Sequence, residues 1–228
     1  MPYLIPRPHM NQISLNNVFH RYPGGKEVLH NINLTIDAGE RICLIGSSGA
    51  GKSTLLRLMA ALEQPYSGTV IVAGHNTSTM STSELPYLRR QCGLILDDVK
   101  LLPNHSVMAH VLLPLDIAGI DRQSAQAQAL SVLETVGLNQ YTEHSPMSLS
   151  GGDQQRLRIA RAIVHQPILL FADEPTTNLD ADDAEAIGAL FRKINLSGTT
   201  VILASHDRQL VTQFKPRLIE LNHGKLRA

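Results

Sequence analysis

The sequence predicts an α/β fold that combines a parallel sheet with an antiparallel β layer and a helical insertion. Three short apolar runs, starting at Glu40, Ile168 and Thr199, have the character of buried parallel strands. Each run ends in polar residues, where the carboxyl end of a strand should lie. Two earlier strand patterns within residues 12–36 are separated by a Pro-Gly-Gly turn at 23–25, which predicts an antiparallel hairpin.

Length and composition fit one globular domain with a sizeable insertion. The chain has 228 residues, of which 43% are hydrophobic and 18% charged, a balance that supports a packed core and disfavours disorder. Its 20 basic and 20 acidic side chains cancel, so the basic excess of a general nucleic-acid binder is missing. Cys43 and Cys92 are too few for a disulfide-stapled domain, and we interpret them as reduced thiols.

The pattern along the chain divides it into a leader and one domain. Residues 1–10, MPYLIPRPHM, match no secretion signal and are interpreted as a flexible leader before a single domain of residues 11–228. No apolar run reaches the roughly eighteen residues that a membrane helix needs. We expect the β layer and sheet core at about 11–96 and 165–228, and a helical subdomain at about 97–164.

The clearest helix of that subdomain lies in SAQAQALSVLETVGL. Ser124 is the expected N-cap, and Gly137 is the expected stop. The apolar side chains of Leu130, Leu133 and Val136 recur at helical spacing and should share one buried face.

The strongest chemical signal is GSSGAGKS at residues 46–53, which fits G-x-x-x-x-G-K-[ST] between a predicted strand and a predicted helix. The glycines let the backbone wrap a polyphosphate, so that N–H groups and the positive helix end face it. Lys52 would contact the β- and γ-phosphates, and Ser53 would offer a hydroxyl to Mg²⁺. A chance glycine turn is the alternative, which the strand and helix disfavour. We therefore predict a P-loop NTPase whose nucleotide-binding residues include Gly46, Ser47, Ser48, Gly49, Ala50, Gly51, Lys52, Ser53 and Thr54.

Further candidates follow two of the predicted core strands. Asp173 comes at the carboxyl end of the run from Ile168, where a Mg²⁺ ligand belongs, and Glu174 could polarise an attacking water. His206 ends the run from Thr199 and could donate a hydrogen bond to the γ-phosphate. Alone, Asp-Glu fits a solvated turn, and a lone histidine usually serves packing. Their positions beside a P-loop favour the chemical interpretation.

A second anion-binding candidate opens another predicted helix, from about Gly152 to His165. Ser150 can cap this helix, and the glycines of LSGGDQQR let an anion approach its N–H groups. GSSGAGKST, LSGGDQQR, LLFADEPTTNLD and ASHD also occur in the order and spacing of the ATP-binding cassette (ABC) ATPases. The chain resembles this family over nearly its whole length after the leader.

The resemblance implies a RecA-like core and an ATP-dependent, head-to-tail homodimer. Ser150, Gly151 and Gly152 of one copy would close over the γ-phosphate held by Lys52 of the other. It also implies that Glu174 is the catalytic base and His206 a switch. Tyr22 lies where an aromatic ring stacks on adenine, and Asp180 closes the segment Asn178-Leu179-Asp180, which matches the family's dimer-contacting loop.

Asp97 departs from the family pattern. The segment CGLILDDVKLL places this aspartate where the family usually has a glutamine. An aspartate can still bind Mg²⁺, but it adds negative charge near the γ-phosphate and donates no hydrogen bond when ionised. Asp97 is therefore a candidate catalytic and metal-binding residue, and we expect slow hydrolysis or altered coupling.

Three segments, LPYLRRQCGLI, KLLPNHSV and VLLPLDIAGI, resemble the cell-division branch of the family. The lipoprotein-releasing and macrolide-exporting branches are the alternatives. The cell-division branch implies an integral membrane partner of the FtsX type at the cytoplasmic face of the inner membrane. Leu101, Leu102 and Pro103 would then line a groove for a helix of that partner, or else belong to the subdomain core.

Two other functional classes compete with this interpretation. A soluble cassette acting on DNA or ribosomes is disfavoured by the single P-loop and the zero net charge. A structural subunit that binds ATP but hardly hydrolyses it is consistent with Asp97, whereas Glu174 and His206 favour an enzyme.

Overall fold

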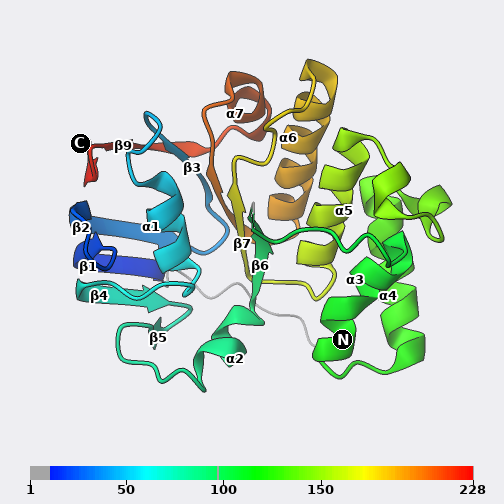
Figure 1. Ribbon diagram of the computed structural model, residues 1–228, viewed down its shortest axis with the longest axis horizontal. Coiled ribbons are helices and arrows are strands. Elements are labelled where there is room, and N and C mark those ends of the chain that lie inside the picture. The colour runs from blue at the N-terminus through cyan, green and yellow to red at the C-terminus, as the bar shows by residue number, and fades with distance from the viewer. Residues whose placement is uncertain (1–10, 97, 228) are drawn as a thin grey trace.

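The computed structural model describes residues 11–96 and 98–227. Two β-sheets and seven α-helices make up this part of the chain, with an antiparallel β layer at one end and a group of helices at the other (Figure 1). The proposed leader, residues 1–10, and the candidate Asp97 lie outside the described residues.

The central sheet has six strands in the order β10-β9-β3-β8-β7-β6. All of its pairs are parallel except the terminal β9–β10 hairpin. The strands predicted from the runs at Glu40, Ile168 and Thr199 are confirmed as β3, β7 and β8, which are adjacent through β8. The bounds are β3 Arg41–Ile45, β6 Cys92–Ile95, β7 Leu169–Asp173, β8 Thr200–Ala204, β9 Arg217–Asn222 and β10 Lys225–Leu226.

The second sheet is antiparallel, in the order β2-β1-β4-β5. Strands β1 (Asn11–Arg21) and β2 (Glu27–Asp37) form the predicted hairpin. Strands β4 (Ser67–Val72) and β5 (His75–Asn76) complete the sheet, and the sequence pattern does not predict them. The short run of β4 begins at an exposed serine and a glycine, so it carries little of the alternation that marks a strand.

Alternate residues of the central strands pack on opposite faces of the sheet. From β7, Leu169 and Phe171 join the core beneath α1 (Lys52–Met59), whereas Leu170 and Ala172 join a second core. That second core lies beneath α5 (Gly151–Ile163), α6 (Ala181–Leu196) and α7 (Arg208–Phe214). Figure 1 shows α1 on one side of β6 and β7 and the pair α5 and α6 on the other.

The helical subdomain is formed by α3 (Val107–Ile117), α4 (Arg122–Val136) and one face of α5, which pack around a third core. Two short 3₁₀ turns, Asn139–Tyr141 and Pro146–Ser148, lead into α5. A further short helix, α2 (Leu85–Arg89), precedes β6 on the other side of the insertion. Helix α5 contributes to two cores, since Leu157 faces the subdomain and Ile159 faces the sheet.

Two details predicted for α4 are wrong. The N-cap is Asp121, whose carboxylate accepts the Ser124 N–H at 3.0 Å, because an extended aspartate three residues earlier already satisfies that donor. Leu130 is 45% exposed, and Ala129 takes the inward position in its place. The predicted end at Gly137 is confirmed, with a left-handed backbone of φ 78°.

The two cysteines are buried and unpaired, as the low cysteine count predicted. Burial raises the pKa of both thiols, Cys43 and Cys92, to about 12, which leaves them protonated at neutral pH. Among the described helices, none has the combined length and apolarity that crossing a membrane requires.

His110 of α3 is a fully buried polar side chain in the helical subdomain. Its Nε2 accepts the Leu102 N–H at 2.8 Å, so its Nδ1 carries the proton and donates to the Ser106 carbonyl at 2.8 Å. Burial lowers the pKa of His110, and the nearby Arg161 and His105 lower it further, while the bond to Ser106 acts in the opposite direction. The folded chain therefore holds this imidazole neutral.

Because His110 takes up a proton more readily in the unfolded chain, the free energy of unfolding should fall as the pH drops below about 6.5, the ordinary histidine pKa. Above that pH the imidazole is neutral in both states and the effect vanishes. Urea denaturation between pH 5.5 and 8 measures this slope, and His110→Phe should reduce it. An unchanged slope in the variant would show that His110 is not responsible.

Candidate nucleotide-binding site

The residues predicted to carry chemistry meet at the carboxyl-terminal edge of the central sheet. One row of the sheet joins Leu44 of β3, Ala204 of β8 and Asp173 of β7 through successive parallel pairings. Neighbouring strands lie about 4.8 Å apart, so the segments that follow this row are held side by side. They are the glycine loop after β3, the turn with His206 after β8, and Glu174 after β7.

The glycine loop is shaped by close contacts with the rest of the chain. Gly46 has φ 147°, and a Cβ at this position would lie 2.1 Å from the carbonyl oxygen of Leu221 in β9. The Lys52 ammonium donates to the carbonyls of Gly46 and Ser47 at 2.9 and 3.2 Å, and the side chain is 9% exposed. The lysine is thus folded over its own loop, where it faces any anion that the loop binds.

Tyr22 lies beside the first turn of α1. Its hydroxyl is 3.2 Å from Thr54 Oγ1 and donates to Glu63 Oε1 at 3.2 Å, while its ring packs edge-on against His20. The residue is 41% exposed. The structure therefore brings the predicted adenine-stacking residue next to the glycine loop and leaves much of the residue open to solvent.

The donor set at this edge suits Mg²⁺. Ser53 offers a hydroxyl oxygen in the first turn of α1, and Asp173 offers a carboxylate at the end of β7, on the far side of β8 from β3. Hard oxygen ligands of this kind are those that Mg²⁺ takes in proteins, usually together with phosphate oxygens and water.

Glu174 and His206 are in direct contact. The His206 Nδ1 lies 2.9 Å from Glu174 Oε2, and the His206 backbone N–H donates to the same oxygen at 3.4 Å. Glu174 has a left-handed backbone, φ 44°, and its N–H donates to the Ala204 carbonyl at 2.8 Å. The Glu174 side chain is 24% exposed and that of His206 76%. The two loops at the strand ends therefore present one carboxylate–imidazole pair.

A second link between these loops was not recognised from the sequence. The Thr176 hydroxyl donates to Asp207 Oδ2 at 2.7 Å, while Asp207 Oδ1 accepts the N–H groups of Gln209 and Leu210 at the start of α7. This pair fixes the segment after Glu174 against the segment after His206. The only signal in the sequence is the aspartate in the N-cap position of a helix.

The serine-glycine motif lies at the start of α5, as predicted. The Ser150 hydroxyl accepts the Asp153 N–H at 3.1 Å, which makes it the N-cap. A Cβ on Gly152 would lie 2.1 Å from a carboxylate oxygen of Asp183 in α6, so any side chain there requires the Asp183 carboxylate to move. Arg156 pairs with Asp153 of its own helix at 3.5 Å and with Asp183 of α6 at 3.3 Å, and the second pair links the two helices.

Asp180 is the N-cap of α6, since its carboxylate accepts the Asp183 N–H at 2.8 Å. The loop before it lies against the serine-glycine motif, because a Cβ on Gly151 would be 3.6 Å from the Leu179 side chain. These elements pack on the face of the sheet opposite to α1 (Figure 1). One chain therefore does not bring Ser150 and Lys52 together.

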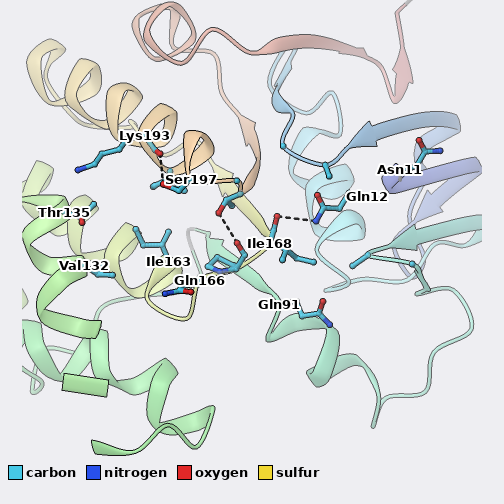
Figure 2. A pocket seen from close by; sticks show the side chains of 18 residues that line it. Asn11, Gln12, Gln91, Val132, Thr135, Ile163, Gln166, Ile168, Lys193 and Ser197 are labelled. Carbon is cyan, nitrogen blue, oxygen red and sulfur yellow. Dashed lines mark hydrogen bonds between the residues drawn. The ribbon is translucent and has the colours of Figure 1, made fainter. Parts of the chain in front are cut away.

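A further hollow of the described chain lies away from this site. A cavity of about 1060 Å³ opens at the edge where the parallel strands begin, between the start of β1, the end of α5 and the turn before β8. Figure 2 shows Val132 and Thr135 of α4 on one side of it and Gln12 on the other, bonded to the Ile168 carbonyl at 3.4 Å. This cavity is separate from the site at the strand ends.

Comparison with known proteins agrees with this arrangement. Residues 29–177 match the ABC transporter family, so the chain belongs to that family and its fold is that of an ATP-binding cassette. The chain superposes on the dimeric structure of MJ0796, a bacterial ABC transporter cassette, with a TM-score of 0.85 and 33% identity over 95% of this chain and 97% of that one. A post-hydrolysis state of MJ0796 bound to ADP and Pi gives a TM-score of 0.86 and 32% identity, with the same coverage.

The chain is also similar to curated cell-division proteins. It is 42% identical to the cell division ATP-binding protein FtsE of Haemophilus influenzae, over 94% of this chain and 99% of that protein. FtsE of Escherichia coli K12 is 40% identical over 94% and 96%, and FtsE of Bacillus subtilis is 37% identical over 93% of each chain. The resemblance inferred from the motifs is thus confirmed, both to the ABC ATPase family and to its cell-division branch.

The two glycines of the motif should differ sharply in their tolerance of a methyl group. Gly152→Ala displaces the Asp183 carboxylate, which pairs with Arg156 at 3.3 Å, and should lower the free energy of unfolding by about 1 kcal/mol, the lower end of the usual cost of overpacking. In Gly151→Ala the new methyl group contacts only Leu179, at an ordinary distance, and should change the free energy of unfolding little. Chemical denaturation of both variants compares the two positions. Equal stabilities would contradict the close approach of α5 to α6.

Proposed function

We propose that the chain is the ATP-binding and ATP-hydrolysing subunit of a membrane ABC complex, in which two copies close head to tail on ATP. The observation that carries this proposal is the placement of two anion-binding elements on opposite faces of the sheet. Lys52 on one face and the Ser150-capped helix on the other cannot grip one triphosphate within a chain. A second copy, related by a two-fold axis, supplies the missing half of each site.

In this dimer, residues 46–54 wrap the phosphates of ATP, and Tyr22 stacks on the adenine. Ser150, Gly151 and Gly152 of the second copy direct the N-terminal N–H groups of α5 at the γ-phosphate. Asp180, which caps α6 beside them, lies in the contact between the copies. Closure excludes water, so each of these interactions strengthens as the site forms.

Hydrolysis is assigned to the carboxylate–imidazole pair. Glu174 accepts the proton of the attacking water, and His206, in contact with Glu174 at 2.9 Å, orients the carboxylate and reaches toward the γ-phosphate. Ser53 and Asp173 hold Mg²⁺, with Asp97 as a further ligand proposed from the sequence alone. When bound, the ion neutralises charge on the β- and γ-phosphates. Membership of this ATPase family and the ADP- and Pi-bound relative support turnover.

The FtsE relatives support a cell-division role with an integral membrane partner of the FtsX type. In that setting the chain acts at the cytoplasmic face of the inner membrane, and closure signals across the bilayer. Of the residues expected to meet the partner, Leu102 is 41% exposed and Pro103 is exposed, whereas Leu101 is buried in the subdomain core. We therefore assign the contact to Leu102 and Pro103 and exclude Leu101.

Glu174→Gln tests the enzyme against the alternative of a nucleotide-binding structural subunit. Loss of the base should reduce phosphate release roughly 10²- to 10⁴-fold and trap an ATP-bound dimer, visible by size-exclusion chromatography with light scattering. Lys52→Ala, which weakens phosphate binding, should show neither turnover nor a dimer. A wild-type rate no higher than that of Glu174→Gln would favour the structural subunit.

Asp97→Gln tests whether the aspartate slows the reaction. Removing its negative charge near the γ-phosphate should raise the rate of phosphate release and change its dependence on Mg²⁺ concentration. Asp98→Asn, which alters the neighbouring exposed carboxylate, is the matched control. The assignment fails if Asp97→Gln leaves both the rate and the Mg²⁺ dependence as they were.

A further inference from the structure

The segment 99–103, here called the anchored segment, belongs to no helix or strand and is held by side chains of the helical subdomain. Arg161 donates to the carbonyls of Val99 and Lys100 at 2.9 and 3.1 Å. The Leu102 N–H donates to His110 Nε2 at 2.8 Å. The Ser145 hydroxyl donates more weakly, to the Pro103 carbonyl at 3.3 Å. The backbone of this stretch is therefore fixed to α3, to α5 and to the turn before α5.

Arg161 makes the most specific of these contacts. Its two terminal nitrogens each bind one of two consecutive carbonyls, in the fixed fork geometry of a planar guanidinium. Within the part of the chain that the structure describes, both of its hydrogen bonds go to backbone oxygens. The contact therefore holds the backbone of the anchored segment and does not depend on the side chains of that segment.

Helix α5 joins Arg161 rigidly to the serine-glycine motif. Arg161 lies eleven positions after the N-cap Ser150, about 16 Å along the axis at 1.5 Å per residue. The same helix packs on both the subdomain core and the sheet core. A displacement of the helix start is thus transmitted to the guanidinium.

The opposite end of the segment is tied less firmly to the glycine-loop helix. Asp98 pairs with Arg57 of α1 at 3.1 Å, but its side chain is 61% exposed, and exposed pairs of this kind contribute little. The Val99 side chain also packs against the core beneath α1. Against these two contacts stand four hydrogen bonds to the helical subdomain, two from Arg161, one to the buried His110 and one from Ser145. When α5 shifts relative to α1, the segment should follow α5.

We propose that Arg161 and His110 are positioning residues that make the anchored segment move with α5, and so carry the nucleotide state to the exposed Leu102 and Pro103. The proposal rests on the proposed function, in which ATP displaces α5. It adds the physical connection between the γ-phosphate contact and the surface assigned to the membrane partner. His110 suits this task because its neutral ring accepts from Leu102 while donating to Ser106.

Paired spin labels test the connection. Cysteines introduced at the exposed Lys100 and Thr79 report the segment, and a second pair at Gln126 and Thr79 reports the subdomain. The native cysteines are buried and protonated, so the labels go to the introduced positions. Distances are measured by pulsed electron resonance with and without Mg-ATP, in the Glu174→Gln background that traps the closed state. The parent should show an ATP-dependent shift in both pairs.

Arg161→Met should keep the shift of the Gln126 pair and lose at least half of the Lys100 shift, and Arg161→Lys should recover part of it. His110→Phe, which keeps a ring but loses both hydrogen bonds, should act in the same direction and serves if Arg161→Met does not fold. Arg158→Met is the matched control, because Arg158 lies on the same helix and binds Gln155 within it at 3.1 Å.

Four results would overturn the connection. The Lys100 shift could persist in Arg161→Met, or be lost equally in Arg158→Met, and either outcome removes the role of Arg161. If the parent shows an ATP-dependent distance change in the Gln126 pair but none in the Lys100 pair, the connection is refuted and the proposed closure is not. If neither pair of the parent responds to ATP, the proposed closure fails together with it.

Discussion

The site depends on the pairing that keeps the ends of β3, β8 and β7 in one row. Leu44, Ala204 and Asp173 are fixed relative to one another by backbone hydrogen bonds, which do not depend on the chemistry of the side chains that follow. Three loops from distant parts of the sequence start from this row. Each loop can vary in composition while its origin stays in place, which is how a parallel sheet positions a reaction centre.

Local signals in the sequence were sufficient for most of this edge. The spacing of glycines 46, 49 and 51 and Lys52 alone predicts the glycine loop. The acidic pair Asp173-Glu174 after an apolar run predicts the end of a core strand. The structure places the glycine loop, Glu174 and His206 at one sheet edge and joins the last two by a 2.9 Å contact. The expectation that Ser150 caps the motif helix also holds.

What the sequence left open depends on partners far away in the chain. Thr176 and Asp207 are 31 positions apart and Arg161 and Val99 are 62 apart, so no local pattern connects them. The α4 cap was misassigned because serine and aspartate are both good N-caps and only the backbone decides between them. The predicted burial of Leu130 is wrong because a small alanine, which here faces the subdomain core, gives a weaker hydrophobic signal than an exposed leucine.

The hairpin of β9 and β10 forms one wall of the glycine loop. The Leu221 carbonyl leaves no room for a side chain at Gly46, and the Gly224 N–H donates to the Ala50 carbonyl at 3.1 Å. The motif of residues 46–53 therefore takes its full shape only with a segment some 170 positions later. During synthesis on the ribosome, most of the polypeptide must emerge before the phosphate cradle is complete. A nascent chain should consequently acquire affinity for nucleotide late, in a single step, rather than when its most recognisable motif first appears.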